Sequence, residues 1–396
     1  MKVALVCDWL TTVGGAESVL LALHEMYPSA PIYTSQYSKK GIDWFEDADV
    51  RTGWLQYFPA KLRRLLGPLR QSYFSHLDLS DYDLVISVTG AEAKAVRTTP
   101  KTGKTRTKCA KTEQSEQAEH SCVHLCYCHV PTQYYWGKYD EYLENPGFGV
   151  FNPLARFALK LFVKPLRKKD FQSAQQPDQF ITISKYAADQ IKKYYKRESV
   201  IIYPPLDLKK FSTGLSTSRE IKSEKSQTKK TLNYITTSRQ VNWKRLDICV
   251  EACLKTGANL LVIGSGPEHN NLVKIANKAS NITFLDAMPQ DELKKYLVQA
   301  DAYLFPSCEP FGLAPIEAMA CGVPVIAYGE GGALDYIKPK VNGLFFDRQS
   351  SSSLIKAMEK FNPSDYSKNV VKNTTLEFDK TNFKAKIREL VRENVR

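Results

Sequence analysis

No stretch of the 396-residue sequence approaches the roughly 18 consecutive apolar residues that a membrane-spanning helix needs. The first ten residues, MKVALVCDWL, also lack the layout of a signal peptide, because they pass directly into an apolar run typical of a core strand. Both absences argue against a membrane-spanning or secreted protein. We therefore expect a cytoplasmic chain, and attachment to the inner face of a membrane stays open.

The sequence also lacks a disulfide framework. Its nine cysteines are an odd number and stand among apolar neighbours, which suits reduced thiols better than paired ones. One cluster, SCVHLCYCHVP at 121–131, holds three cysteines and two histidines. These residues alternate along a strand pattern, whereas structural zinc sites use Cys-x2-Cys pairs on turns. We expect buried thiols there and no metal.

Acidic residues are in deficit, with 42 Asp and Glu against 55 Lys and Arg and a formal net charge of +13. Such a balance predicts a polyanionic partner: nucleic acid, an anionic membrane face or phosphorylated ligands. Segments 59–70 and 155–171 concentrate the charge at helical spacing with apolar residues, and the first contains Lys61, Arg63, Arg64 and Arg70. Helices of this kind can lie on anionic lipid. A solvated helix that covers the core explains each segment equally well, but two in one half of the chain favour the membrane slightly.

Apolar runs that alternate with helical patterns are what the sequence has in abundance. The runs are continuous and rich in β-branched residues, which is typical of parallel sheets covered on both faces. The runs form two series along the chain, and helical patterns lie between successive runs. This alternation predicts an α/β fold with two doubly wound domains. The predicted strands are 2–8, 82–90, 122–130 and 178–184 in the first series, and 231–238, 259–267, 281–288, 301–307 and 324–330 in the second.

Two polar segments, 97–121 and 212–231, interrupt this alternation and contain little to bury, so we expect surface loops whose role the sequence does not indicate. The Pro-Pro stretch at 203–207 is typical of a stiff connector between domains. The predicted parts are a first domain at 1–205, a second at 206–377, and a last helix at 378–396 that packs back on the first domain.

Ligands of open parallel sheets bind at the carboxyl ends of the strands, so the loops that follow strands are examined first. Gly14 and Gly15 follow the first strand and open a helix, where backbone amides can approach a phosphate. A plain strand-to-helix turn explains them as well. Arg239 and Lys244 follow the first strand of the second domain, where two cations can bind a diphosphate. Gly264 ends the next strand and suits the approach of a flat base or ribose.

The stretch CEPFGLAP at 308–315 leaves a strand and enters a helix. We expect that helix to begin at Pro315, which puts Glu317 in its first turn. A carboxylate there complements the helix dipole by less than about 1 kcal/mol. Glu309 lies on the loop and has no such explanation. Between the two glutamates, backbone amides are suited to hydroxyl or phosphate oxygens near Phe311, Gly312 and Leu313.

These blocks resemble, in the same order, those of the retaining glycosyltransferases of family 4, which have the GT-B fold. Glu309, seven residues and then Glu317, in EPFGLAPIEAMACGVPVIA, carry the resemblance most specifically, and SRQVNWKRLD, IGSGPE and GEGGALDYI support it. In the first domain VGGAE, CYCHVPTQYYWGKYDEY, ISKYAADQIKKYY and VIIYPPLD are most similar to the bacterial polysaccharide mannosyltransferase branch. The likeness covers nearly the whole chain except the two polar segments. It implies two Rossmann-like domains facing across a cleft, the first for the acceptor and the second for a nucleotide-sugar.

For the second domain, the resemblance implies that Glu317 binds the donor ribose hydroxyls and Glu309 binds hydroxyls of the transferred hexose. The amides of Phe311, Gly312 and Leu313 would help Glu309. Arg239 and Lys244 would bind the diphosphate and stabilise the charge of the departing nucleotide, in place of a metal.

Three further positions match the family's pattern. Gly15, after Gly14, would approach the diphosphate from the first domain, and Met288 would lie where the backbone contacts the base. His129 would lie close to the sugar and the acceptor. A core histidine with satisfied hydrogen bonds is the alternative for His129.

The resemblance thus implies a hexosyltransferase that needs neither cofactor nor metal, and the branch implies an α-mannosyltransferase that uses GDP-mannose and a lipid-linked or polysaccharide acceptor. One alternative is a UDP-sugar donor carrying glucose, galactose or N-acetylglucosamine. A non-catalytic nucleotide- or nucleic-acid-binding protein is another, supported only by charge. A sugar phosphorylase or epimerase would share the two-domain layout, and the lack of a pyridoxal lysine segment disfavours the phosphorylase. The sequence indicates neither the acceptor, the linkage nor the oligomeric state.

Overall fold

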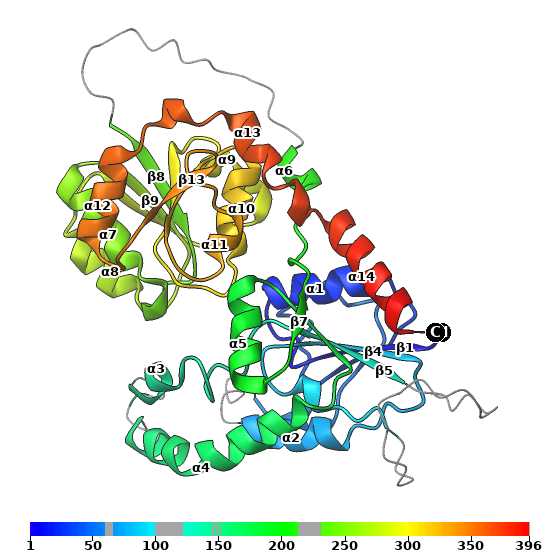
Figure 1. The fold of residues 1–396 in the computed structure, drawn as a ribbon. Helices are drawn as coiled ribbons and strands as arrows, with labels where there is room; N and C mark the ends of the chain where they lie inside the picture. The colour runs from blue at the N-terminus through cyan, green and yellow to red at the C-terminus, as the bar shows by residue number, and fades with distance from the viewer. Residues whose placement is uncertain are drawn as a thin grey trace. The chain divides into compact units, whose positions relative to one another are not determined.

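The computed structural model of the chain describes residues 1–59, 66–99, 122–144, 146, 149, 152–212 and 231–395. The chain divides into two compact units, one of Met1–Pro205 with Thr381–Arg396 and one of Leu206–Lys380 (Figure 1). Most of the two polar segments expected as surface loops, and residues 60–65 of the first basic segment, lie outside the described residues.

The first unit is built on a seven-stranded sheet whose neighbouring strands all pair in parallel, in the order β3-β2-β1-β4-β5-β6-β7. The strands are β1 Val3–Cys7, β2 Ile32–Thr34, β3 Val50–Arg51, β4 Leu84–Thr89, β5 Val123–Cys128, β6 Gln179–Thr182 and β7 Ser199–Ile201. The order reverses between β1 and β4, and both of these strands are buried along their whole length. Four of the strands were predicted from their apolar runs. β2, β3 and β7 are too short for a periodic signal.

The helices of this unit are α1 Gly15–His24, α2 Gly67–His76, α3 Tyr139–Glu144, α4 Asn152–Ser173, α5 Lys185–Tyr195 and, beyond the second unit, α14 Lys380–Asn394. α14 packs against the first sheet through Phe383, which is buried and whose ring centroid lies 5.9 Å from that of Tyr127 on β5. Lys384 Nζ forms an ion pair with Glu25 Oε2 at 2.5 Å. The end of the chain is therefore fastened to the unit in which the chain begins.

The second unit has a six-stranded sheet that is also parallel throughout, in the order β10-β9-β8-β11-β12-β13. Its strands are β8 Asn233–Thr237, β9 Asn259–Ile263, β10 Ile282–Leu285, β11 Ala302–Phe305, β12 Val325–Tyr328 and β13 Gly343–Phe346. Its helices are α6 Lys209–Ser212, α7 Leu246–Thr256, α8 His269–Ala276, α9 Gln290–Leu297, α10 Leu313–Ala320, α11 Ala333–Tyr336, α12 Ser351–Lys360 and α13 Lys368–Asn373. α7 lies between α8 and α12, and its buried side chains share one apolar core with those of the sheet (Figure 1).

Both sheets have the strand order of a Rossmann-type domain, in which two halves wind outward from a central pair of strands. The predicted α/β class with doubly wound Rossmann-like sheets is confirmed for each unit taken by itself. In each unit the strand order reverses beside the first strand, at β1/β4 and at β8/β11, and ligands of this fold class bind at the carboxyl ends of such strands.

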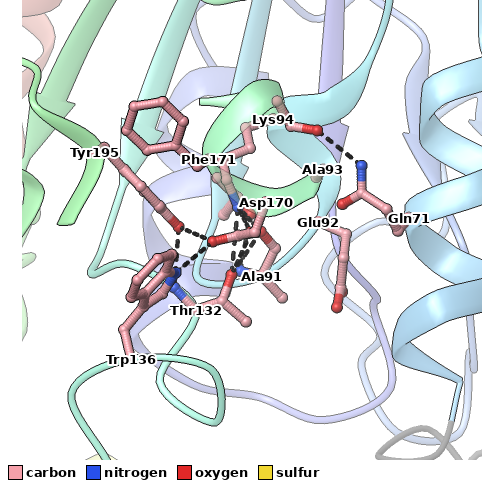
Figure 2. Close-up of polar contacts among 12 residues, drawn as sticks. Gln71, Ala91, Glu92, Ala93, Lys94, Thr132, Trp136, Asp170, Phe171 and Tyr195 are labelled. Atoms are coloured by element: carbon pink, nitrogen blue, oxygen red, sulfur yellow. Dashed lines mark hydrogen bonds and ion pairs between the residues drawn. The ribbon is translucent and has the colours of Figure 1, made fainter. Parts of the chain in front are cut away.

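A buried polar network fastens the end of α4 to the rest of the first unit (Figure 2). Asp170 is fully buried, and its carboxylate accepts hydrogen bonds from four side chains. Lys94 Nζ and Thr132 Oγ1 donate to Oδ1 at 2.7 and 2.9 Å, while Trp136 Nε1 and Tyr195 Oη donate to Oδ2 at 2.7 and 2.8 Å. A buried carboxylate with this many donors is well compensated for its lost hydration. The network holds α4 to the loops after β4 and β5 and to α5.

The position of Arg70 corrects the prediction that it belongs to a lipid-facing basic helix. Arg70 lies on α2 with 1% of its surface exposed, and its Nε donates to Glu92 Oε2 at 2.9 Å. Its guanidinium carbon lies 4.9 Å from the centroid of the Trp9 ring. An arginine in this setting stabilises the core edge instead of meeting lipid. Among the described residues, no helix is both long and apolar enough to cross a membrane.

Candidate active site

Two oppositely charged side chains meet at the carboxyl edge of the second sheet, where the strand order reverses. Lys244 lies in the turn after β8 and Glu309 in the loop after β11, and these two strands are neighbours. Lys244 Nζ forms an ion pair with Glu309 Oε1, and the two side chains are 13% and 14% exposed. Ser307 Oγ donates to the same Oε1 at 2.8 Å, and the Trp243 ring centroid lies 4.6 Å from the Lys244 ammonium. Ser307 and Trp243 had no place in the sequence-based prediction.

Arg239 lies two residues beyond the end of β8, and its side chain is exposed. The loop that carries it packs against Gly264, which follows β9. Gly264 has φ +134°, and a Cβ atom there would lie 2.0 Å from the carbonyl oxygen of Ser238. Buried Gln240 donates from Nε2 to the Gly264 carbonyl at 2.7 Å. A glycine is therefore required at 264 for backbone packing, and its approach to a base or ribose stays a prediction.

The helix after Glu309 begins two residues earlier than predicted. α10 is Leu313–Ala320, so Pro315 is its third residue and Glu317 its fifth. Gly312 provides the sharp entry with φ +89°, a backbone conformation that other residues rarely adopt. The expectation that Glu317 lies in the first turn is thus wrong, because no acidic residue lies there. A favourable contact with the helix dipole no longer explains this glutamate.

Residues after β12 form two hydrogen bonds to the loop between Glu309 and α10. The Gly332 amide donates to the Glu309 carbonyl at 2.7 Å, and the Tyr336 hydroxyl donates to the Phe311 carbonyl at 2.9 Å. The Phe311 side chain is buried, so this residue can offer a ligand only its backbone. These contacts fix the path of the loop that carries Glu309 and the predicted amides.

Glu317 is half-buried, and Gln290 Nε2 donates to its Oε1 at 3.0 Å. Burial raises the pKa of the carboxyl to about 6, because the charged form loses hydration there. Met288, also half-buried, lies two residues before Gln290 at the start of α9. At neutral pH Glu317 is ionised at a cost to the fold, and a carboxylate in that state accepts hydroxyl donors readily.

Replacing Glu317 by glutamine is expected to stabilise the fold above pH 7. The folded-state pKa is raised, so the stability that comes from the neutral carboxyl is fully present below about pH 4.5 and is lost as the pH rises through about 6. The carboxylate then costs about 1–2 kcal/mol, which an uncharged amide avoids. Denaturant unfolding between pH 4.5 and 8 measures the difference, with Glu359→Gln on the exposed face of α12 as the control. No gain at pH 8 would mean that other contacts compensate the charge.

His129 follows β5 in the first unit, and its ring packs edge-on against Tyr127 with the centroids 5.5 Å apart. Its Nε2 is buried and, among the described residues, has no hydrogen-bond partner. Burial lowers the pKa of the ring to about 4, so it is neutral at pH 7. This disagrees with the alternative of a satisfied core histidine, because a buried ring nitrogen without a partner requires an explanation.

Gly15 is the first residue of α1, and Gly14 is its N-cap residue, which has no side chain to cap the helix. Glu17 lies in the first turn and is buried. Its carboxylate complements the helix dipole and so competes with any phosphate for the same amides. The role of the two glycines toward a diphosphate stays a prediction.

The cysteine and histidine cluster of β5 does not converge on one point. Cys126 and Cys128 are buried in an apolar cluster with Phe180 and Tyr195, while His124 Nε2 lies 2.8 Å from Ser87 Oγ. Within the described ranges, no three His, Cys, Asp or Glu side chains gather in a way that could hold a metal ion.

Residues 218–375 match the family model described as Glycosyl transferases group 1. The chain carries a group 1 glycosyltransferase domain. Arg239, Lys244, Gly264, Met288, Glu309 and Glu317 all lie within the matched residues of this domain.

Sequence relatives of the chain include several mannosyltransferases. The chain is 29% identical over 180 residues to the GDP-mannose-dependent monoacylated alpha-(1-6)-phosphatidylinositol monomannoside mannosyltransferase of Corynebacterium glutamicum, which covers 40% of this chain and 46% of the relative. It is 30% identical over 105 residues to the 2-deoxystreptamine N-acetyl-D-glucosaminyltransferase of Streptomyces fradiae, which covers 26% of this chain and 25% of the relative. The chain spans about half the length, or less, of the curated relatives that it matches.

Solved structures similar to the chain include proteins described as glycosyltransferases. Anabaena HepE in complex with UDP-glucose superposes with a TM-score of 0.67 at 16% identity, over 99% of this chain and 100% of the other. WaaG, a glycosyltransferase involved in lipopolysaccharide biosynthesis, gives a TM-score of 0.62 at 14% identity, over 98% and 99% of the two chains. At such identities the likeness shows the fold alone.

Proposed function

We propose that this protein is a retaining hexosyltransferase that moves mannose from GDP-mannose to a lipid-linked or polysaccharide acceptor without a metal or cofactor. The observation that carries the proposal is the meeting of Lys244 and Glu309 at the carboxyl edge of β8 and β11, inside the group 1 domain. Carboxyl edges where the strand order reverses are the ligand-binding edges of this fold class. The mannosyltransferases among the sequence relatives support the choice of donor.

In this proposal Lys244 and Arg239 bind the donor diphosphate. Negative charge grows on the bridging oxygen as the nucleotide departs, and two cations held at a preformed edge stabilise that charge. Glu309 accepts hydrogen bonds from hydroxyls of the transferred hexose, and Glu317 accepts them from the ribose. Gly264 and Met288 lie in the loops after β9 and β10 and would contact the base and ribose, while the amides of Gly312 and Leu313 at the start of α10 would help Glu309.

His129 and the start of α1 are the contributions that we propose from the first unit. The neutral ring of His129 has a buried Nε2 without a partner among the described residues, and we propose that the ring turns to bring this nitrogen to a sugar hydroxyl. Gly14 and Gly15 would bring backbone amides near the diphosphate. This unit would also provide the acceptor side of the reaction.

A UDP-sugar donor is the second candidate. It is favoured by the structural neighbour solved with UDP-glucose and by the relative that transfers N-acetylglucosamine. The loop residues that we assign to the diphosphate and ribose contact parts that GDP and UDP donors share. They therefore do not distinguish the base.

A donor panel tests the proposal directly. GDP-mannose, UDP-glucose, UDP-galactose and UDP-N-acetylglucosamine are each added without metal, and thermal unfolding and nucleotide release are followed. A ligand that binds the folded state raises the unfolding temperature by mass action, so GDP-mannose is expected to raise it most and to be broken down. If nucleotide is released only from UDP-sugars, the donor is a UDP-sugar and not GDP-mannose. If none of the four compounds shifts the unfolding temperature or is broken down, the proposed transferase activity is contradicted. With an acceptor in hand, the anomeric configuration of the product, read by NMR, tests retention.

We further propose that α4 attaches the protein to an anionic membrane face. The α4 outer face has four large apolar side chains, each more than half exposed, and exposed lysines beside them. The apolar residues are Leu154, Phe157, Leu161 and Phe162, and the lysines are Lys160, Lys164, Lys168 and Lys169. Val163 and Asp170, which α4 buries, lie on the side of the helix opposite Leu154, Phe157 and Leu161. An exposed apolar stripe bordered by lysines is typical of helices that lie in a lipid headgroup region. A solvated surface helix has no need of four exposed large apolar side chains.

The double variant Phe157→Ser/Leu161→Ser is expected to bind phosphatidylglycerol-containing vesicles at least about tenfold more weakly than the unmodified protein, because each buried apolar side chain contributes about 1.5–3 kcal/mol. Co-sedimentation at low and high salt measures the partition, and salt is expected to weaken it. Val273→Ser/Val370→Ser removes two exposed apolar side chains from the second unit and is the control. Equal binding by both double variants, or no binding by the unmodified protein, would contradict the proposal.

A further inference from the structure

Two neighbouring side chains contact the Glu309 carboxylate. Lys244 Nζ forms an ion pair with Oε1, and Ser307 Oγ donates to the same oxygen at 2.8 Å. Ser307 is 2% exposed, and the ionic side chains are 13% and 14% exposed. Trp243 shields the ammonium group, whose nitrogen lies 4.6 Å from its ring centroid. The pair is therefore largely withdrawn from water, where the attraction between its charges is stronger than on an open surface.

The two tasks that the proposed function assigns to this pair require each side chain to change its partner. Lys244 has to meet a diphosphate, which carries negative charge, while Glu309 has to meet sugar hydroxyls, which are donors. A diphosphate placed against Lys244 competes with the carboxylate and is repelled by it. The ion pair has to open, or the carboxylate has to turn toward another donor, before both side chains serve the nucleotide-sugar.

We propose, on the basis of the proposed function, that Glu309 controls the affinity of the diphosphate site. Without a ligand, Glu309 neutralises Lys244. Hydroxyls of the bound hexose draw the carboxylate away and leave Lys244 to the diphosphate. A nucleoside diphosphate without a sugar has no hydroxyls to offer Glu309, so it binds against the carboxylate. The site thereby prefers the intact donor and favours release of the nucleotide product.

Ser307 is a positioning residue in this scheme. Its hydroxyl donates to Glu309 Oε1, so the carboxylate that the hexose hydroxyls draw from Lys244 stays attached to the loop after β11. The loop itself is fixed by the bond from the Gly332 amide to the Glu309 carbonyl. Only the end of the side chain has to move for the partner to change.

The test compares the binding of GDP and UDP, without a sugar, to the unmodified protein and to Glu309→Gln by isothermal titration calorimetry. The amide keeps the shape but does not hold the lysine, so Glu309→Gln is expected to bind the nucleoside diphosphate about fivefold more tightly, the scale of a modest ion pair. The intact nucleotide-sugar is expected to bind no more tightly than before. The preference for donor over diphosphate then falls about fivefold or more. Glu359→Gln, which removes the same charge from an exposed site on α12, is expected to leave both affinities unchanged.

Ser307→Ala separates positioning from folding. The ion pair remains, so the affinity for the bare diphosphate is expected to stay within about twofold, while kcat for the donor falls about tenfold. If Ser307 has only a structural role, Ser307→Ala would lower the unfolding temperature without lowering kcat more than it changes the diphosphate affinity. Diphosphate affinity that is equal or weaker in Glu309→Gln overturns the inference, although the transferase function stands if the donor is still used. If neither GDP nor UDP binds the unmodified protein, the proposed function and this inference both fail.

Discussion

Lys244→Ala is expected to lower kcat/KM for donor breakdown about 10²- to 10³-fold. The ammonium group lies at the edge where β8 and β11 adjoin, half-enclosed by Trp243 and Glu309. A preformed cation that meets the charge of a departing group is worth about 3–4 kcal/mol in the transition state. Because that charge is greatest in the transition state, kcat is expected to fall more than donor binding. The rate of nucleotide release, followed over a range of concentrations of the donor that the panel identifies, measures kcat and KM.

The control for this variant is Lys295→Ala on α9, which removes an exposed lysine from the same unit. It lowers the net charge equally, so any general effect on the attraction of an anionic donor appears in both proteins. Lys244→Arg is expected to recover part of the lost rate, because it restores the charge with a different shape. Undiminished turnover in Lys244→Ala would remove this residue from the site and leave Arg239 as the predicted cation.

Asp170→Asn is expected to lower the free energy of unfolding of the first unit by about 3–5 kcal/mol. The variant leaves Lys94 buried with no charge to balance it, and such a loss is typical when one partner of a buried pair is removed. The amide also cannot accept from all four donors that surround the carboxylate. Tryptophan fluorescence during denaturant unfolding is a suitable measurement, since four of the five tryptophans belong to the first unit.

Asp189→Asn on α5 is the matched control, because this aspartate is exposed and carries the same charge. The double variant Lys94→Met/Asp170→Leu is expected to be more stable than Asp170→Asn, since both charges leave together and apolar groups fill the space. Equal stability of Asp170→Asn and Asp189→Asn would mean that the network in Figure 2 contributes little. α4 would then need another anchor to hold its outer face.

Of the thirteen strands in the described part of the chain, nine follow from local pattern, because a buried parallel strand requires an unbroken apolar run. The strands that the sequence did not indicate are β2, β3, β7 and β13, which have two to four residues each and pair at or near the sheet edges. The start of α10 was misplaced for a related reason. Proline is common at the first helical position, but the left-handed conformation of Gly312 begins the helix two residues earlier.

Some residues of the candidate site could be predicted from the sequence, and others could not. Glu309, Glu317 and Lys244 were predicted because they stand in recognisable motifs after predicted strands. Ser307 was missed, because a serine at a strand end has no distinguishing spacing. Arg70 was assigned to an exposed helix, because charge in a sequence does not reveal a buried partner 22 residues away. His129 could be suspected from the motif, but its unpartnered ring nitrogen could not.

The sequence by itself determined the two series of parallel strands, the doubly wound class of each unit, and the motifs that lie within the group 1 domain. These are local properties, since apolar runs, turns and short motifs act over a few residues. Only the tertiary structure decided that Lys244 contacts Glu309, that Ser307 holds the same carboxylate, that burial raises the pKa of Glu317, and that Arg70 is buried. Each of these depends on which strands and helices become neighbours. The β8–β11 adjacency, for example, brings together residues 65 positions apart in the chain.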